Sequence, residues 1–503
     1  MNRFRIMTAA VSSGSGKTII TCGLLSFMKN RGLNVSSFKC GPDYIDPMFH
    51  RRVLGIPGGN LDTFFAGENE IRSLAAGRTS DDADDGYAVI EGVMGIYDGI
   101  ASAAGTGASG SCYEVAKITE TPVVLIVNSR GMGQTVISVI RGILADDREC
   151  LIRGIILNRI SPHYYEQIKP LLVSALDEIS RRRGVSAELL GGIPTAENIK
   201  LESRHLGLMM PHEIEDLQEQ IKNAERLIAD NLDTGRLLEI MSGAGSLITE
   251  DKTAVYHSCH NEESLRCSAP GTDLHDGSIS VEKTGVINSD APVLAVARDE
   301  AFCFYYEENL RMLEQNGIRI KEFSPLHDRC LPEDADGILL GGGYPELYAE
   351  TLSGNTGMRV SVRDAIRGGM PSLAECGGFM YLLEMLEDSG DKLRPMAGVL
   401  RGTASNRGRL GRFGYITLHD RGMSDETLIT GLCIKGHEFH YFDSDNNGSA
   451  AVAVKPGSGR SWECMHAGPG HLWGYPHLYY PSCPELVERF RKRMIAFAKY
   501  SRA

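Results

Sequence analysis

The sequence of 503 residues has no uninterrupted apolar run that approaches the roughly 18 residues of a membrane span. It is also short of basic residues: 52 Lys and Arg stand against 65 Asp and Glu, a net charge of −13. This acidic excess argues against a broad nucleic-acid-binding face. The 12 cysteines form no CxxC pair, which argues against a disulfide scaffold. We therefore predict a cytoplasmic protein with no membrane and no nucleic-acid partner.

Regular alternation of strand-like and helix-like segments runs from Phe4 to about Pro194. The longer amphipathic segments, such as Thr18–Lys29 and Tyr164–Arg182, predict helices, and Ile214–Met241 predicts one or two more. Nearly continuous apolar strands between helices are typical of a parallel sheet covered on both faces. The predicted strands are Phe4–Ala9, Val35–Phe38, Tyr87–Ile90, Val123–Val127, Gly154–Leu157 and Leu189–Ile193.

The same alternation resumes at Pro292. Helices are predicted at about Tyr305–Asn316, Val360–Arg367 and Pro484–Lys499. Strands are predicted at Val293–Ala297, Ile318–Phe323, Gly337–Leu340 and Pro371–Ala374. The pattern predicts an α/β fold with two doubly wound domains, residues 1–240 and 291–503.

The stretch between these domains, residues 241–290, is rich in Ser, Gly, Asp, Glu and Thr and has little periodicity. We interpret it as a linker or insertion. Its His and Cys residues match no standard zinc spacing, so a polar linker with incidental His and Cys is the favoured interpretation. These residues are His257, Cys259, His260 and Cys267.

A phosphate-binding loop is the first chemical motif. Residues 12–18, Ser-Ser-Gly-Ser-Gly-Lys-Thr, follow a predicted strand and open a predicted helix, as such a loop requires. The glycines let backbone N–H groups approach a phosphate, the lysine supplies charge, and the threonine hydroxyl can bind Mg²⁺. The loop predicts ATP binding by Ser13, Gly14, Ser15, Gly16, Lys17 and Thr18.

Carboxylates stand where two further strands end. Asp43 and Asp46 follow the second predicted strand, and Glu91 and Asp98 follow the third. In a parallel sheet these positions lie at the carboxyl edge, where ligands bind. Because Mg²⁺ prefers carboxylates and water, we predict that Glu91 and Asp43 join Thr18 as its ligands. The alternative is that these acids cap helices or form turns.

Asn158 ends the strand Gly154–Leu157, again at the predicted carboxyl edge. Its amide has both a donor and an acceptor and could bind the adenine edge. A simple turn asparagine is an equal alternative on this signal alone.

The sequence Glu375-Cys376-Gly377-Gly378 joins a predicted strand to a helix through a sharp turn. This arrangement is a nucleophile elbow with cysteine in place of serine. The helix start favours a thiolate, and the Gly377 N–H can donate to an oxyanion. Gly342, in the glycine run that ends another strand, is predicted to supply the second oxyanion donor. The pattern predicts Cys376 as a catalytic nucleophile.

A thiol nucleophile needs a base, and several downstream histidines could serve. Spacing does not choose among them, because a core or capping histidine is the alternative for each. The candidates are His437, His440, His466, His471 and His477.

Taken together, residues 1–240 and 292–500 resemble the cobyrinate a,c-diamide synthase family of glutamine-dependent ATP amidoligases in corrinoid biosynthesis. The resemblance spans nearly the whole chain outside the linker. In the N-terminal half it depends on Ser13–Thr18, Lys39–Pro47, Asn60–Asp62, Glu91–Asp98, Gly154–Arg159 and Ser203–Gly207. In the C-terminal half it depends on Gly341–Glu346, Ala374–Gly378 and Gly436–His440.

The resemblance implies an N-terminal P-loop domain like dethiobiotin synthetase and a C-terminal class I glutamine amidotransferase-like domain. It implies ATP, Mg²⁺, L-glutamine and a carboxylated tetrapyrrole as ligands. A homodimer is one assembly that the sequence leaves open. In residue terms it implies Cys376 as nucleophile, His477 as its partner, Glu91 and Asp43 in Mg²⁺ and phosphate chemistry, Asn158 near the adenine, and Tyr44, Asp46 and Asp98 at the tetrapyrrole and its activated carboxylate.

The sequence departs from the family pattern at three positions. Val11 replaces the first glycine of the phosphate loop, and Asn128 stands where Asp is common. Tyr479 stands where the family often has a second histidine and a standard class I amidotransferase has glutamate. The acid that orients His477 is therefore unassigned.

The expected reaction is amidation of the a- and c-side-chain carboxylates of cobyrinic acid through acyl phosphates, in cobalamin biosynthesis. One alternative is the same amidation of nickel sirohydrochlorin. Outside this class, the N-terminal half could be a partition-type ATPase switch, although no lysine precedes Gly16 within the loop.

Overall fold

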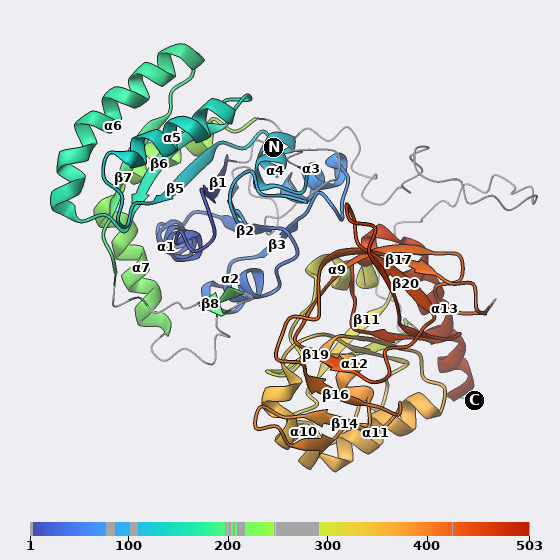
Figure 1. Cartoon of the computed structure of the whole chain (residues 1–503). Coiled ribbons are helices and arrows are strands. Elements are labelled where there is room, and N and C mark those ends of the chain that lie inside the picture. The colour runs from blue at the N-terminus through green and yellow to red at the C-terminus, as the bar shows by residue number, and fades with distance from the viewer. Residues whose placement is uncertain are drawn as a thin grey trace, which may run out of the picture.

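The computed structural model describes residues 4–76, 86–100, 109–196, 199, 203–204, 207–208, 217–245, 247, 291–424 and 426–501. They form two α/β lobes (Figure 1). The N-terminal lobe runs from β1 (Phe4–Ala10) to α8 (Thr234–Ser242), and the C-terminal lobe from β10 (Val293–Ala297) to α13 (Pro484–Ser501). Among the described residues, no helix has the length and apolar character needed to cross a membrane.

Seven parallel strands form the sheet of the N-terminal lobe, in the order β3-β2-β4-β1-β5-β6-β7. Six of them contain the six predicted ranges: β1, β2 (Val35–Cys40), β4 (Tyr87–Glu91), β5 (Val123–Asn128), β6 (Ile152–Asn158) and β7 (Glu188–Ile193). The edge strand β3 (Gly58–Leu61) was not predicted, because its two glycines weaken the strand signal.

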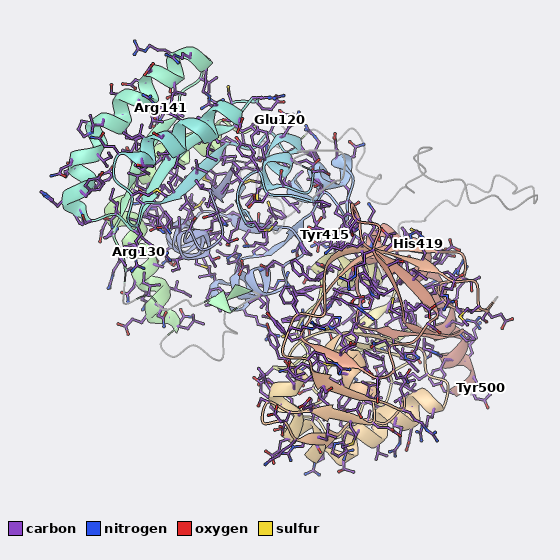
Figure 2. All side chains as sticks on the ribbon, in the orientation of Figure 1. Glu120, Arg130, Arg141, Tyr415, His419 and Tyr500 are labelled. Atoms are coloured by element: carbon purple, nitrogen blue, oxygen red, sulfur yellow. The ribbon has the colours of Figure 1, made fainter. Side chains whose placement is uncertain are left out.

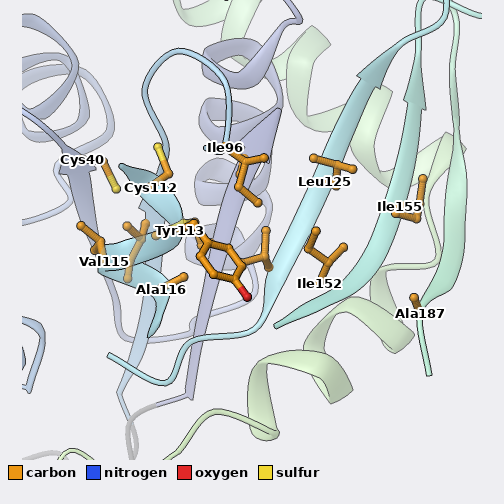
Figure 3. Packing of buried hydrophobic residues seen from close by; sticks show 14 of the residues in the cluster. Cys40, Ile96, Cys112, Tyr113, Val115, Ala116, Leu125, Ile152, Ile155 and Ala187 are labelled. Carbon is orange, nitrogen blue, oxygen red and sulfur yellow. The ribbon is translucent and has the colours of Figure 1, made fainter. Parts of the chain in front are cut away.

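Helices cover both faces of this sheet, because successive strand residues point to opposite sides. Ile6 packs in one apolar cluster and Met7 in the other. The first cluster includes α1 (Lys17–Asn30), α2 (Ile45–Leu54), α7 (Leu217–Asn231) and α8. The second, seen in Figure 3, includes α3 (Glu68–Ala76), α4 (Cys112–Ile118), α5 (Thr135–Asp146) and α6 (Pro162–Arg183). The predicted doubly wound arrangement is confirmed.

The C-terminal lobe has a second, mostly parallel sheet in the order β11-β10-β12-β13-β23-β22. Only the edge strand β22 (His466–Ala467) runs antiparallel. The other strands are β11 (Arg319–Phe323), β10, β12 (Gly337–Leu340), β13 (Ser372–Glu375) and β23 (His471–Gly474). Its helices include α9 (Glu307–Gln315), α10 (Ala349–Gly354), α11 (Thr356–Arg367), α12 (Gly377–Leu382) and α13.

Two further sheets between residues 385 and 478 were not predicted. Most of these strands have only two to four residues, and the two longer ones, Arg412–Asp420 and Cys433–His440, interrupt buried positions with exposed or partly exposed ones, so they lack the apolar runs that marked the parallel strands. One comprises β15 (Leu393–Pro395), β14 (Met385–Glu387), β16 (Thr403–Asn406) and β19 (Phe442–Ser444). The other comprises β21 (Ser461–Cys464), β20 (Ala451–Val454), β17 (Arg412–Asp420), β18 (Cys433–His440) and β24 (His477–Leu478).

The segment Ile214–Met241 forms two helices over its described part, and Asp233 separates them. Its carboxylate accepts a hydrogen bond from the Arg236 N–H at 2.9 Å and so caps α8. The predicted linker, with His257, Cys259, His260 and Cys267, lies outside the described residues apart from 241–245 and 247.

The two lobes meet through polar pairs and a small aromatic cluster. Phe65 of the N-terminal lobe packs with Tyr306 and Tyr479 of the C-terminal lobe. The Tyr415 hydroxyl donates to the buried Asp62 carboxylate at 2.8 Å. In Figure 2, Tyr415 lies where the two lobes come together.

Removing the Tyr415 hydroxyl should destabilise this contact in a pH-dependent way. Burial raises the pKa of Asp62 to about 6, and the Tyr415 hydroxyl opposes that rise. Tyr415→Phe removes a hydrogen-bond donor from the ionised Asp62 carboxylate. We therefore expect the free energy of unfolding to fall by about 1–3 kcal/mol above pH 6. This difference should shrink toward zero at lower pH, where Asp62 is protonated in both the native protein and the variant. Thermal unfolding on both sides of that pH measures it.

The matched control is Tyr500→Phe, since the Tyr500 side chain is 83% exposed near the C-terminus. It should leave unfolding unchanged at every pH. An equal loss for Tyr415→Phe in acid and in base would contradict a role through the charge of Asp62.

Candidate active site

The phosphate-binding loop joins β1, at the centre of the N-terminal sheet, to α1. Gly14 and Gly16 have φ of 73° and 90°, which only glycine adopts freely. No side chain caps α1, so its first N–H groups are open to an anion. A Cβ at Gly16 would lie 2.3 Å from Asn158 Nδ2, and that amide donates to the Ser15 carbonyl at 2.8 Å. Asn158 thus holds the loop in place through this hydrogen bond. That Asn158 binds the adenine stays a prediction.

Lys17 and Thr18 begin α1 and reach toward the ends of neighbouring strands. Lys17 Nζ donates to the Met94 carbonyl at 2.6 Å, and burial, followed by the charge of Lys39, lowers its pKa. The Thr18 hydroxyl donates to Glu91 Oε1 at 2.7 Å. The structure therefore brings together two of the predicted metal ligands, Thr18 and Glu91.

A buried charge network surrounds Glu91. Lys39 Nζ lies 2.8 Å from Glu91 Oε1 and 2.5 Å from Asp46 Oδ2. Burial disfavours the Lys39 cation, but Asp46 and Glu91 outweigh it and hold its pKa well above the ordinary value. His50 Nε2 lies 3.8 Å from Glu91 Oε2. Burial lowers the pKa of His50 to about 4, so His50 is neutral at physiological pH.

The residues around Glu91 fit a hard cation. Glu91 Oε2 is buried and has no hydrogen-bond partner among the described residues. An unpaired buried carboxylate oxygen is costly unless something binds it. Within the same residues, no group of three His, Cys, Asp or Glu side chains converges on one point. This suits Mg²⁺, which is usually held by one or two protein oxygens with waters and substrate phosphates.

The carboxylates of Asp43 and Asp98 accept hydrogen bonds from nearby backbone N–H groups in this structure. Asp43 Oδ1 accepts from the Ile45 N–H at 2.9 Å and so starts α2, and burial, followed by Asp46, raises its pKa to about 7. The exposed Asp98 accepts from the Gly95 N–H at 2.7 Å. Their metal and substrate roles stay predictions.

Tyr44 is the predicted substrate residue whose position is least expected from sequence. It follows Asp43 in the N-terminal lobe, yet its ring packs against the C-terminal lobe. It stacks on Phe304 with centroids 5.5 Å apart and lies 5.2 Å from the His477 ring. The two halves of the chain therefore meet at Tyr44.

Cys376 forms the predicted elbow between β13 and α12. Its φ of 48° and ψ of −104° lie outside the regions that ordinary residues favour. Its N–H donates to the Gly474 carbonyl at 2.8 Å, which ties the turn to the neighbouring strand β23. Strain of this kind is characteristic of functional sites.

The glycine run at the end of β12 lies between Cys376 and His477. A Cβ at Gly342 would lie 2.3 Å from His477 Cε1, and a Cβ at Gly377 would lie 3.1 Å from the Gly343 nitrogen. The close approach of these groups requires glycine. The structure thus places Cys376, Gly342, Gly377 and His477 in one neighbourhood, while the oxyanion roles of the glycines stay predictions.

The Cys376 thiol is protonated in this environment. Burial raises its pKa well above the usual range, Glu346 adds to the rise, and the Gly377 N–H opposes it. Such a thiol needs a base to become nucleophilic. Burial, together with His437 and His440, holds the pKa of His477 well below its ordinary value, so His477 is neutral and able to accept a proton.

The other candidate histidines have different partners. His437 Nδ1 pairs with the Tyr306 hydroxyl at 2.9 Å, although its ring stacks on His477 with centroids 5.1 Å apart. His440 pairs with Glu438 at 3.1 Å. His466 bonds the Asn446 carbonyl, and His471 stacks on Trp473.

Several residues of this neighbourhood were not predicted as site residues. They are His50 beside Glu91, Phe304 beneath Tyr44, and Glu375 and Tyr306 near the histidine pair. Only Glu375 carried a local signal, since it directly precedes the predicted nucleophile. The others are brought in by tertiary contacts.

Comparison with known proteins agrees with the two-site arrangement. A model described as "CobQ/CobB/MinD/ParA nucleotide binding domain" matches residues 6–208. A model described as "CobB/CobQ-like glutamine amidotransferase domain" matches residues 293–479.

Proteins named cobyrinate a,c-diamide synthase are similar over almost the entire chain. The one from Caldanaerobacter subterraneus is 32% identical over 496 residues, 98% of this chain and 99% of its own. The one from Clostridium acetobutylicum is 34% identical and covers 94% and 97% of the two chains. The one from Methanothermobacter thermautotrophicus is 33% identical and covers 98% and 100%. The chain is therefore a glutamine-dependent amide ligase and belongs to the cobyrinate a,c-diamide synthase family.

Proposed function

We propose that this enzyme uses ATP and glutamine to convert the a- and c-side-chain carboxylates of cobyrinic acid to amides, through acyl phosphates, in cobalamin biosynthesis. The observation that carries the proposal is the position of Tyr44. It directly follows Asp43 in the N-terminal lobe, which carries the phosphate-binding loop, and its ring centroid lies 5.2 Å from that of His477. Under this proposal, ammonia must pass from the glutamine-hydrolysing site to the carboxylate-activating site, and Tyr44 connects the two lobes that carry them.

Activation of the carboxylate is assigned to the N-terminal lobe. The open N–H groups of α1 and the Lys17 ammonium would bind the β- and γ-phosphates of ATP. Thr18 and Glu91 would hold Mg²⁺, which when bound neutralises phosphate charge. Asp43, Asp46, Tyr44 and Asp98 would position the tetrapyrrole carboxylate, and Asn158 would lie near the adenine. Phosphorylation makes the carboxyl oxygen a leaving group that ammonia can displace.

Ammonia supply is assigned to the C-terminal lobe. The Cys376 thiol would attack the glutamine side-chain amide after His477 takes its proton, with Gly342 and Gly377 donating to the oxyanion. Breaking of the C–N bond gives ammonia and a thioester on Cys376, and water then hydrolyses the thioester to glutamate and the free thiol. Because neutral water would protonate ammonia to unreactive ammonium, we propose internal passage along Tyr44.

One incubation tests the function. The protein receives ATP, Mg²⁺ and glutamine with either cobyrinic acid or nickel sirohydrochlorin, and mass spectrometry looks for replacement of OH by NH₂ at two carboxyls. We expect the cobyrinic acid product. A product only from nickel sirohydrochlorin would move the substrate to the nickel tetrapyrrole, and no product from either would refute the proposal. The partition-type switch is disfavoured, because the proteins that are similar over nearly the whole chain are named cobyrinate a,c-diamide synthase.

Truncating Tyr44 should uncouple the two reactions. Tyr44→Ala opens a path for water between the lobes, because the ring fills space between Phe304, Tyr306 and His477. Ammonia released at Cys376 would then be lost to solvent as ammonium. We expect the ratio of glutamate released to amide formed to rise severalfold above parity. Parallel measurement of glutamate and of the amide product gives the ratio.

Phe304→Ala is the matched variant, since it loosens Tyr44 from the C-terminal side without touching the nucleotide site. It should raise the ratio as well, whereas Tyr44→Phe should keep it near parity. A ratio that stays at parity in both alanine variants would refute passage along Tyr44.

A further inference from the structure

His477 needs a group that orients it. A base that activates a thiol is usually held by a third side chain, which fixes the tautomer and stabilises the imidazolium. Tyr479 occupies the position where other amidotransferases have glutamate, but it points away from this task. Its ring stacks on Phe65 with centroids 4.9 Å apart, and its hydroxyl faces Glu70 of the other lobe at 3.4 Å.

The side chain of His477 has an unused nitrogen. His477 is 2% exposed, and its Nδ1 has no hydrogen-bond partner among the described residues. The carboxylate facing that nitrogen belongs to Glu375, whose Oε2 lies 3.9 Å away. A shift of about 1 Å would bring the two atoms to hydrogen-bond distance.

Glu375 is held in place from two sides. It is the last residue of β13 and directly precedes Cys376, so one turn places the acid and the nucleophile. Its Oε1 accepts from the Tyr480 hydroxyl at 3.0 Å, and the Leu478 N–H also donates to its carboxylate. Both partners lie just beyond His477 in the chain, which fixes the acid relative to the base.

Glu438 and His437, which also lie near His477, are already paired. Glu438 accepts from Trp462 at 3.0 Å and pairs with His440. His437 stacks on His477 but its Nδ1 is bound to Tyr306. Among the described residues, Glu375 is the carboxylate that the structure places against His477 Nδ1.

We propose that Glu375 is the positioning residue that accepts the Nδ1–H of His477 and leaves Nε2 free for the Cys376 thiol. This rests on the proposed function of the C-terminal lobe as a glutaminase. The proton of the thiol passes to Nε2 as the sulfur bonds to the amide carbon. The same proton then goes to the departing nitrogen as the C–N bond breaks, so that the thioester and ammonia form and the imidazole is neutral again.

Burial raises the pKa of Glu375 to about 8, although the Tyr480 hydroxyl and the Leu478 N–H oppose the rise, so the pH profile is followed to above pH 8, where the ionised form makes two opposite outcomes distinguishable. The titratable groups that face this carboxylate are Tyr44, Tyr306, Cys376, His477 and Tyr480. Those that face His477 from other elements are His437 and His440. If Glu375 supports the imidazolium, its loss makes the Cys376 thiolate appear at higher pH. If Glu375 is only a neighbouring negative charge, its loss makes the thiolate appear at lower pH.

The experiment uses the full-length enzyme with Glu375→Gln, Glu375→Asp and Glu70→Gln. Glu70 is the matched control, since it is a half-buried glutamate that also faces a tyrosine hydroxyl. Three quantities are measured: glutamate release from glutamine, the pH profile of Cys376 alkylation by iodoacetamide, and amidation supported by ammonium salts. Alkylation of Cys376 needs no tetrapyrrole, so that result stands whichever tetrapyrrole is the substrate.

We expect Glu375→Gln to lower glutamate release by about 10²-fold or more and to move the alkylation profile to higher pH. Glu375→Asp should recover part of both, and ammonium-supported amidation should stay within about twofold of the native enzyme. Glu70→Gln should leave the alkylation profile in place. A shift to lower pH, unchanged glutamate release, or an equal loss of ammonium-supported amidation in Glu375→Gln would overturn the proposal.

Discussion

Cys376→Ala should abolish glutamine-dependent amidation while amidation supported by ammonium salts persists. The substitution removes only the sulfur. At a φ of 48°, alanine is no more strained than cysteine, so the fold should be unchanged. Loss of a catalytic nucleophile lowers the rate by about 10⁴-fold or more, because no other group forms the covalent intermediate. Product formation with glutamine and with ammonium, assayed side by side, measures the effect.

Cys483→Ala is the control, because Cys483 is also a buried thiol of the C-terminal lobe but lies before α13. It should retain both activities. If ammonium fails to restore amidation in Cys376→Ala, the division of labour between the lobes is wrong. If glutamine still supports amidation, another residue is the nucleophile.

Lys17→Ala should have the second large effect and the opposite selectivity. Lys17 lies at the first turn of α1 with its ammonium held against the Met94 carbonyl, where it would meet the transferring phosphoryl group. Losing such a charge lowers phosphoryl transfer by about 10²–10³-fold. We expect that loss in amidation with glutamine and with ammonium alike, while glutamate release at Cys376 continues.

Lys29→Ala is the matched control at the other end of the same helix, where Nζ donates to the Leu54 carbonyl. It should cost some stability and leave ATP-dependent amidation within about twofold of the native rate. Native ammonium-supported activity in Lys17→Ala would show that the phosphate loop is not the site of carboxylate activation.

Much of the fold could be predicted because its signals are local. The apolar strands of both parallel sheets are buried on both faces, so each reads as a short hydrophobic run between helices. The phosphate loop and the Cys376 elbow each depend on a strand, a few small residues and a helix that are adjacent in sequence. Strand β3 was missed because its two glycines weaken the strand signal, and the two further sheets because their strands are very short or interrupted by exposed residues.

The residues of the candidate site likewise include some with a local sequence signal and others that only tertiary contacts bring to the site. Glu91 and Cys376 could be selected from sequence because each stands where a buried strand ends, and Lys17 and Thr18 because they open the helix after the phosphate loop. Spacing alone could not choose the partner of Cys376 among five histidines, and only the tertiary contacts bring His477 close to the glycine run beside Cys376. Tyr44 could be named from the family motif, but its contact with His477 joins residues more than 400 positions apart.

Local order along the chain was thus sufficient to predict two α/β lobes, a nucleotide loop and a reactive thiol, because backbone geometry and hydrophobic alternation act over a few residues. The meeting of Tyr44 with His477, and of Glu375 with the same imidazole, came only from the folded arrangement. Such contacts are selected by packing and by the cost of burying polar groups, and these depend on which distant surfaces come together.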